Sequence, residues 1–232
     1  LRARDLEGRI TYVNPAFCQM VGLTAEQLTG KLAPSERLPV TKSELTQTLE
    51  GRAYTPQQAE LIASAQTPHN ALATEIAHAA GLRAHELLTL CPVAERAADP
   101  RPALDSKWKG RSGEIYTVQG KGGLTREVMI PHELAARLEE RRLDAPQVVT
   151  DRGVFYQSSY DIGGGQRWSN SVSAASERTM GRSTGAHGLR HSYAQERMTE
   201  LQNRGLSRDA ALETVSQEMG HFRPEITETY LR

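Results

Sequence analysis

The sequence predicts an α+β fold that is mainly α-helical and carries a small antiparallel β-sheet. Helix-start signals followed by apolar residues at helical spacing recur along the chain, as at Thr55-Pro56 and Thr67-Pro68. Near the middle of the chain, β-forming residues flank a glycine-rich turn at residues 120–123, which predicts a hairpin. The 232 residues, 38% of them hydrophobic, suffice for a packed core.

The elements before residue 145 follow from caps, glycine stops and periodicity. Thr55 begins a capping box with proline at the first helical position, and a second helix is expected from Thr67 to Gly81. The hairpin strands are predicted at residues 114–118 and 125–130. An amphipathic helix is expected over residues 131–142. Its inward positions are Leu134 and Leu138.

Residues 144–166 are predicted to be loop-rich, with flexible glycines at 163–165, and a helix is expected over residues 169–180. The next helix begins at the histidine box, and its expected core positions are Leu189, Tyr193, Met198 and Leu201. Ser207 caps a helix that Gly220 ends, which would leave His221 at an exposed end. The inward positions of that helix are Leu212, Val215 and Met219. Pro224 starts a short helix that carries Tyr230 near its far end, where a tyrosine is poorly placed to be core.

Composition predicts a soluble, cytoplasmic protein. No apolar run approaches the ~20 residues of a membrane span, and no basic-then-apolar start suggests a secretory signal. Cys18 and Cys91 are the only cysteines, so no disulfide framework is implied and a reducing interior is expected.

Charge is balanced overall and uneven along the chain. Lys+Arg and Asp+Glu both number 28, whereas nucleic-acid binders often show a basic excess. Two stretches nevertheless collect cations, which predicts a basic face with an acidic back. The first set is Arg167, Arg178, Arg182, Arg190 and Arg197, and the second is Lys107, Lys109, Arg111, Lys121 and Arg126.

The stretch from His187 to Tyr230 carries the residues best suited to chemistry. His187 and Arg190 are three apart and share a helix face, so they can address one ligand. The planar guanidinium fork fits two non-bridging oxygens of a phosphodiester. Tyr230 can act as a nucleophile, because a phenol with a pKa of ~10 leaves its phosphate ester more easily than an alcohol does. These side chains predict phosphoryl transfer through a protein nucleophile.

The ordered set His187-Gly188-Leu189-Arg190-His191, Gly220-His221 and Thr227-x-x-Tyr230 resembles the tyrosine recombinase, or phage integrase, family. The resemblance covers about residues 52–232. Residues 81–87 are similar to the family's first arginine box, which makes Arg83 the counterpart of its first catalytic arginine, with Glu86 orienting it. Lys121 matches the lysine that the family carries on its hairpin turn. The alternatives without a function are that Arg83 is a solvated surface arginine and that Lys121 is an ordinary lysine of a turn.

The resemblance implies a mechanism. Tyr230 attacks the scissile phosphodiester of double-stranded DNA to give a 3′-phosphotyrosyl enzyme, while Arg83 and Arg190 neutralise the transition state. His187 helps to accept the tyrosine proton, His221 donates to a phosphate oxygen, and Lys121 acts as the general acid. No cofactor is needed, since the covalent intermediate keeps the ester energy. The family also implies self-association on DNA, as a tetrameric synapse.

The remaining histidines are expected to play no catalytic part. His69, His78 and His132 lack partner motifs and are predicted to lie at the surface, and His85 occupies a variable position of the arginine box. His191 is interpreted as structural support at most. No three histidines have zinc spacing with a cysteine or a carboxylate, so no catalytic metal is predicted.

Residues 5–33 resemble the start of a PAS sensory domain. We therefore expect three parts: a PAS-like fragment at 1–33, a proline-containing linker at 34–51, and a recombinase-like catalytic domain at 52–232. The fragment and linker occupy the space where the family carries its core-binding domain. A binding-only or inactive remnant of an integrase is therefore an alternative function. A PAS-type sensory protein is a third.

Overall fold

The computed structural model describes residues 2–4, 10–13, 18–19, 24–28, 51–120, 122–221 and 223–231. The chain divides into two compact units, Leu1–Glu50 and Gly51–Arg232. In the first unit, strand β1 (Arg2–Arg4) pairs antiparallel with β2 (Ile10–Val13), and α2 spans Ala25–Leu28. Of the predicted linker only Gly51 is described.

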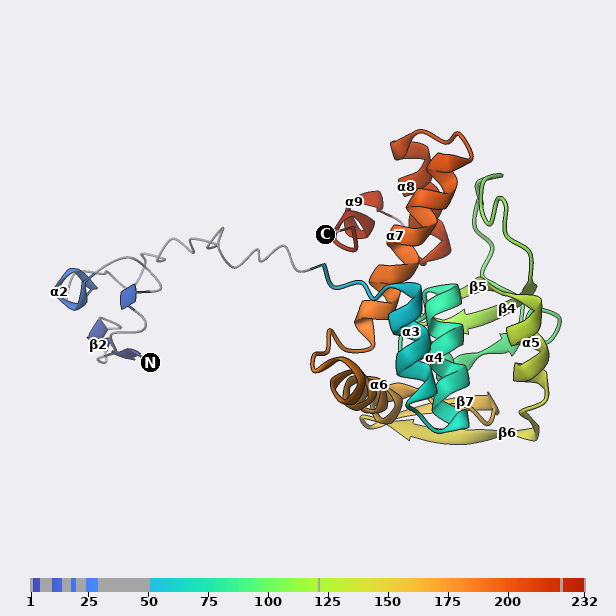
Figure 1. The fold of residues 1–232 in the computed structure, drawn as a ribbon, viewed down its shortest axis with the longest axis horizontal. Coiled ribbons are helices and arrows are strands. Elements are labelled where there is room, and N and C mark those ends of the chain that lie inside the picture. The colour runs from blue at the N-terminus through green and yellow to red at the C-terminus, as the bar shows by residue number, and fades with distance from the viewer. Residues whose placement is uncertain are drawn as a thin grey trace. The chain divides into compact units, whose positions relative to one another are not determined.

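The second unit begins with two helices that lie side by side, α3 (Pro56–Ser64) and α4 (Pro68–Ala80) (Figure 1). The capping box predicted at Thr55 is confirmed, since its hydroxyl accepts from the Gln58 backbone N–H and the Gln58 side chain accepts from the Thr55 N–H. Thr67 makes no such side-chain bond. α4 ends at Gly81, which adopts a left-handed conformation.

The predicted hairpin is confirmed and belongs to a three-stranded antiparallel sheet in the order β3-β4-β5. A 3₁₀ turn, η2 (Glu86–Thr89), leads into the short β3 (Cys91–Pro92). β4 (Glu114–Gln119) pairs with β5 (Thr125–Ile130). Lys121, which follows β4 in the sequence, lies outside the described residues. The helix expected over residues 131–142 is shorter, since α5 spans His132–Glu139.

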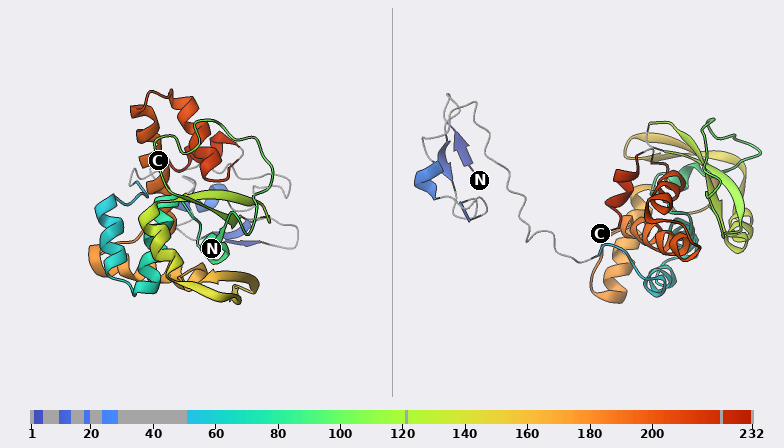
Figure 2. Two further views of the ribbon diagram at one scale, coloured as in Figure 1. Left: turned by 90° about the vertical axis from the view of Figure 1, so that its right-hand side faces the viewer. Right: turned by 90° about the horizontal axis from the view of Figure 1, so that it is seen from above.

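The prediction of a loop over residues 144–166 is wrong. β6 (Arg142–Asp151) and β7 (Val154–Tyr160) form an antiparallel hairpin at the end of the second unit opposite α8 and α9 (Figures 1 and 2). β6 is exposed along most of its length, so it lacks the alternating apolar pattern by which a half-buried strand is recognised.

The glycines at 163–165 are closely packed, which corrects their interpretation as a flexible stretch. α6 spans Gly165–Met180 and so begins four residues before the predicted start. A Cβ at Gly164 would collide with Leu88, and one at Gly165 would meet the Asp151 carboxyl carbon at 2.6 Å. Glycine is required here because backbone and side chains approach too closely for any larger residue.

The last three helices are α7 (His187–Asn203), α8 (Arg208–Glu218) and α9 (Pro224–Glu228). Ser207 caps α8 as predicted, accepting from the Ala210 N–H. The core positions expected in α7 and α8 are all buried.

Two hydrophobic clusters form the core of the described chain, and both lie in Gly51–Arg232. The larger contains residues of α3, α4, the sheet and α6, among them Trp168, and includes Leu189 of α7. The smaller includes Tyr193 and joins α7 to α8 and Tyr230. α7 therefore contributes to both clusters, and Arg190 lies on it between Leu189 and Tyr193. Every described helix is too short or too polar to cross a lipid bilayer.

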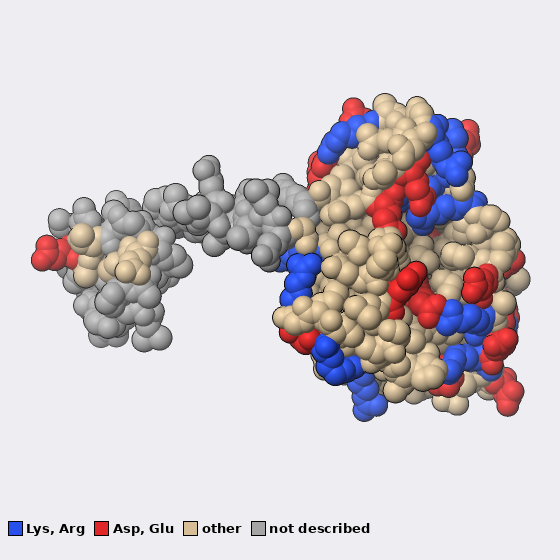
Figure 3. All heavy atoms as spheres, in the orientation of Figure 1, with Lys and Arg blue, Asp and Glu red and all other residues tan. Residues whose placement is uncertain are grey.

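Three of the cations expected on a basic face are buried, so they do not contribute to the surface. Arg190 and Arg197 are 0% exposed and Arg126 is 7% exposed, and each engages protein groups rather than solvent. On the face of Gly51–Arg232 that Figure 3 shows, acidic and basic side chains are interspersed. The predicted α+β class, mainly helical with small antiparallel sheets, is confirmed.

Candidate active site

His221 is the point at which predicted site residues from separate elements meet. Arg83, in the turn after α4, lies with Nη2 3.1 Å from His221 Nε2, and Arg190 of α7 lies with Nη2 3.0 Å from the same nitrogen. The other ring nitrogen, Nδ1, is 2.9 Å from the Thr227 hydroxyl. Guanidinium groups only donate, so Nε2 accepts and the proton is assigned to Nδ1.

His221 is buried, at 5% exposure, which corrects the expectation of an exposed helix end. Gly220 does turn the chain after α8, but α9 then folds back and covers the imidazole through Thr227. Desolvation, followed by the charges of Arg190 and Arg83, lowers the pKa of His221 to about 3. The ring is therefore neutral at physiological pH.

Arg190 is held from three sides. Nη1 donates to the Gly81 carbonyl, while Nη2 donates to the Met219 carbonyl at 2.6 Å and to His221. Its Nε has no hydrogen-bond partner among the described residues. Burial lowers the pKa of Arg190 to about 10, which leaves the group protonated at neutral pH. A buried positive charge is thus fixed beside the imidazole.

Tyr230 lies among three histidine rings. Its ring centroid is 4.8 Å from that of His191, 5.2 Å from that of His187 and 5.3 Å from that of His221. The Arg190 guanidinium carbon is 5.4 Å from the same centroid. Tyr230 is 7% exposed and belongs to the smaller hydrophobic cluster, so the expectation that it lies outside the core is wrong. The main chain at Tyr230 is held in place, because His191 Nδ1 donates to the Tyr230 carbonyl at 3.2 Å.

His187 is the exposed member of the group. Partial desolvation and the charges of His191 and Arg190 lower its pKa to about 4. A neutral imidazole can accept a proton at physiological pH, as the expected role of His187 demands.

An acidic residue and a second arginine support Arg83. Glu86 is 0% exposed and accepts from Arg83 Nη1 and Arg126 Nη2, each at 2.9 Å. Burial alone would raise the pKa of Glu86, but Arg126, Arg190 and Arg83 outweigh it and lower the pKa to about 2. Arg126 was expected from the sequence only as a surface cation, and its place beside Glu86 was not predicted. Alternation along β5 places Arg126 on the same face as Val128 and Ile130, and this is the signal that could have identified it.

The structure thus brings together Arg83, His187, Arg190, His221 and Tyr230, while Lys121 lies outside the described residues. The histidines expected at the surface face carboxylates instead of the site: His69 pairs with Asp161, His78 with Glu196 and His132 with Glu114. His85 is half-buried, with Tyr156 at its ring. Among the described residues, no three His, Cys, Asp or Glu side chains are grouped to hold a metal ion.

Residues 1–59 match the PAS fold family, which extends past the predicted 1–33 fragment. A stretch of 34 residues is 62% identical to the C4-dicarboxylate transport sensor protein DctS of Rhodobacter capsulatus, covering 15% of this chain and 5% of that protein.

Three solved structures are similar to this chain. A XerH site-specific recombinase bound to difH substrate in a pre-cleavage complex has a TM-score of 0.48 and 19% identity over 80% of this chain and 52% of that one. The XerH post-cleavage complex on palindromic difH has a TM-score of 0.48 and 17% identity over 99% and 55%. The Tn1549 transposon integrase in complex with circular intermediate DNA has a TM-score of 0.42 and 17% identity over 78% and 62%. The chain therefore spans little more than half the length of the recombinase chains.

Proposed function

We propose that this chain is a DNA strand transferase that cuts and rejoins DNA through a 3′-phosphotyrosyl intermediate on Tyr230. The observation that carries the proposal is the convergence of two guanidinium groups, those of Arg83 and Arg190, on one acceptor atom at 3.1 and 3.0 Å. The Tyr230 ring centroid lies 5.3 Å from that of the same imidazole, with the two rings tilted by 33°. A tyrosine beside two converging cations suits attack on a phosphodiester.

In this mechanism Arg83 and Arg190 leave His221 Nε2 and bind the two non-bridging oxygens of the scissile phosphate, which accept more strongly than a neutral imidazole. His221 can donate to a phosphate oxygen only when Nε2 carries a proton, so the ring changes its tautomer as the arginines move. His187 accepts the proton of the Tyr230 hydroxyl.

Glu86 and Arg126 keep Arg83 in place without touching the substrate. Lys121 protonates the leaving 5′ oxygen, a role that rests on the family resemblance. The same resemblance supports a cytoplasmic protein that binds double-stranded DNA and assembles on it as a tetramer.

The test uses nicked duplexes from which the cleaved strand dissociates, so that the phosphotyrosyl product accumulates. The duplexes carry randomised flanks, because the target sequence is unknown. A covalent protein–DNA band in wild type that disappears in Tyr230→Phe is expected. A band that persists in Tyr230→Phe would assign the nucleophile to another residue. A gel shift without any covalent band would favour the alternative, a DNA-binding remnant of an integrase.

A second candidate, a PAS-type sensory activity, is supported by the PAS match over residues 1–59 and by the identity to a sensor protein. Flavin or haem absorbance in the purified full chain would support it. Colourless protein would count against a chromophore-based sensor.

A further inference from the structure

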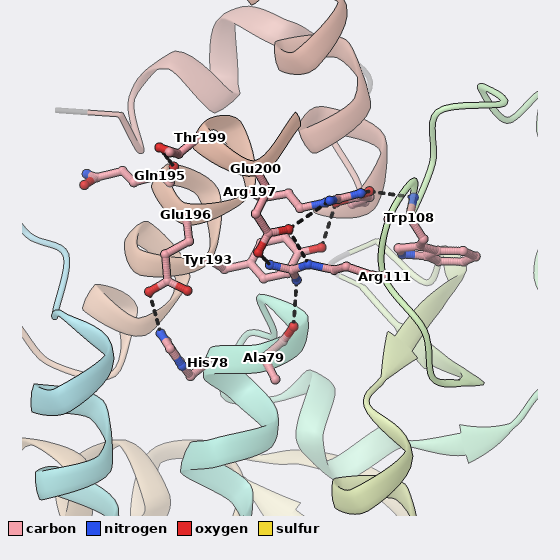
Figure 4. A network of polar contacts seen from close by, with 12 residues as sticks. His78, Ala79, Trp108, Arg111, Tyr193, Gln195, Glu196, Arg197, Thr199 and Glu200 are labelled. Atoms are coloured by element: carbon pink, nitrogen blue, oxygen red, sulfur yellow. Dashed lines mark hydrogen bonds and ion pairs between the residues drawn. The ribbon is translucent and has the colours of Figure 1, made fainter. Parts of the chain in front are cut away.

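A buried carboxylate that the proposed chemistry does not use lies behind the His221 turn. Glu218 ends α8, and both its side chain and that of Arg197 are 0% exposed. In Figure 4, Arg197 of α7 points toward Trp108 of the loop between β3 and β4. Arg197 Nε and Nη2 donate to the two oxygens of Glu218, each at 2.9 Å.

The remaining acceptor sites of the Glu218 carboxylate are also filled. The Tyr193 hydroxyl donates to Oε2 at 2.8 Å, and the Trp108 backbone N–H donates to Oε1 at 2.7 Å. Trp108 has a backbone φ of +57°, a conformation that residues other than glycine seldom adopt. Glu218 therefore joins α7, α8 and a constrained loop through one carboxylate.

The main chain that follows Glu218 runs directly into the candidate site. The Glu218 carbonyl accepts from Arg126 Nη1 at 2.7 Å, and the Met219 carbonyl accepts from Arg190 Nη2 at 2.6 Å. Gly220 then turns the chain with φ +71 and delivers His221. A displacement of Glu218 would consequently move the imidazole relative to both arginines.

Stability alone does not explain such a pair. Taking two charges out of water is costly, and replacing a buried ion pair by apolar residues of similar size is often neutral or stabilising. What an apolar pair cannot supply is orientation, because a bidentate Arg–carboxylate contact fixes both the distance and the plane of its partners.

We propose that Glu218, through its ion pair with Arg197, is a positioning residue that holds the turn Met219-Gly220-His221 in register with Arg83 and Arg190. This inference rests on the proposed strand-transfer function, for which His221 is part of the reacting group. Arg197 and Glu218 act through the main chain and do not contact DNA.

The test compares R197M/E218L with the matched control R137M/E75L, which removes a partly exposed Arg–Glu pair at 40% and 30% exposure between α5 and α4. Four quantities are measured for each: the thermal midpoint, the DNA affinity, the single-turnover rate of covalent complex formation, and the titration of His221 by NMR. In R197M/E218L we expect the thermal midpoint to fall, because the Tyr193 hydroxyl and the Trp108 N–H lose their acceptor. At a temperature well below that midpoint we expect the DNA affinity to be preserved and the rate to fall by roughly tenfold or more.

The His221 titration separates this inference from the proposed function, since it requires no catalysis. Wild-type His221 should remain unprotonated down to pH 4. In R197M/E218L the pKa of His221 should rise toward 6.5, the ordinary pKa of histidine. The control should match wild type in every measurement. A wild type that forms no covalent complex but shows this shift would reject the function and keep the positioning role.

A folded R197M/E218L variant with an unchanged His221 titration would overturn the inference, and so would one with an unchanged rate where wild type is active. Should R197M/E218L fail to fold, E218Q decides instead. Its amide keeps an acceptor for the Trp108 N–H and loses one charge-assisted bond to Arg197. An intermediate His221 titration in E218Q would support the inference, and a wild-type one would refute it.

Discussion

His221 shows how single residues acquire their properties from buried neighbours. Its imidazole is surrounded by Arg83, Arg126 and Arg190, with Glu86 as the compensating anion. These charges make protonation of the ring unfavourable, so the histidine is a neutral acceptor that keeps two guanidinium groups in place. The lowered pKa of His221 is therefore a property of the whole cluster, and no single member produces it alone.

The pH dependence of stability should report the state of His221. Its pKa falls from 6.5 to about 3 on folding, so the unfolded chain binds more protons below pH 6.5. The contribution is present above pH 6.5 and is lost as the pH falls toward 3. Between pH 7 and 5, wild type should lose about 2 kcal/mol more of its free energy of unfolding than His221→Gln does. Urea unfolding at both pH values measures the difference, and equal losses would contradict it.

Arg126 should be needed for stability, because it is buried and pairs with the buried Glu86 carboxylate. Replacing it by methionine leaves the Glu86 carboxylate, 0% exposed, with Arg83 as its remaining ion-pair partner. Breaking a buried pair in this way costs about 3 kcal/mol. Urea unfolding of Arg126→Met should show this loss. The control Arg137→Met, at an ion pair whose arginine is 40% exposed, should lose less than about 1 kcal/mol. Similar losses in the two variants would refute the assignment.

At the scale of elements, the second unit is organised by where helices begin and end. Gly81 and Gly220 both turn the chain just after a helix, and the residues that follow them, Arg83 and His221, lie within hydrogen-bonding distance. The last carbonyl groups of a helix have no hydrogen-bond donor within the helix. Arg190 donates one hydrogen bond to the Gly81 carbonyl, after α4, and one to the Met219 carbonyl, after α8. The helix termini therefore define the site.

The two threonine helix starts provide a matched comparison. Thr55 makes the reciprocal capping bonds with Gln58, whereas Thr67 makes no side-chain cap bond at the start of α4. Thr55→Ala should therefore cost about 1 kcal/mol of unfolding free energy, and Thr67→Ala clearly less. Thermal or urea unfolding of the two variants decides this. A larger loss for Thr67→Ala would show that the capping geometry is not what stabilises α3.

At the scale of the whole molecule, the described core lies within one of the two units. Both hydrophobic clusters are made of residues from Gly51–Arg232, and α7, which carries His187 and Arg190, contributes to both. Hydrogen bonds to the Gly81 and Met219 carbonyls hold the buried Arg190 guanidinium, and the proposed mechanism exchanges only its contact with His221 for one with a phosphate oxygen.

We expect the second unit to fold by itself. A chain of residues 51–232 should unfold cooperatively at the same thermal midpoint as the full chain, because the described clusters need no residue of Leu1–Glu50. Calorimetry of both chains measures this. A markedly lower midpoint for the shorter chain would show that the first unit contributes to the core.

Local signals in the sequence determined the starts of α3, α4 and α8, the glycine stops, the β4–β5 hairpin and the inward positions of α7 and α8. Such signals depend on residues within a few positions of one another, so a short stretch of sequence is enough to recognise them. The same reasoning failed for the β6–β7 hairpin, whose first strand buries almost nothing.

The motif residues were selected in the sequence by residue type and spacing, but only the tertiary structure decided their environment. Burial of His221 and Tyr230, the Arg126–Glu86 contact and the Arg197–Glu218 pair join residues 21 to 138 positions apart. Periodicity and capping do not extend over such separations. Whether a charged side chain is solvated or enclosed depends on which helices pack around it, and so the desolvation that shifts the pKa values in this site appears only in the folded chain.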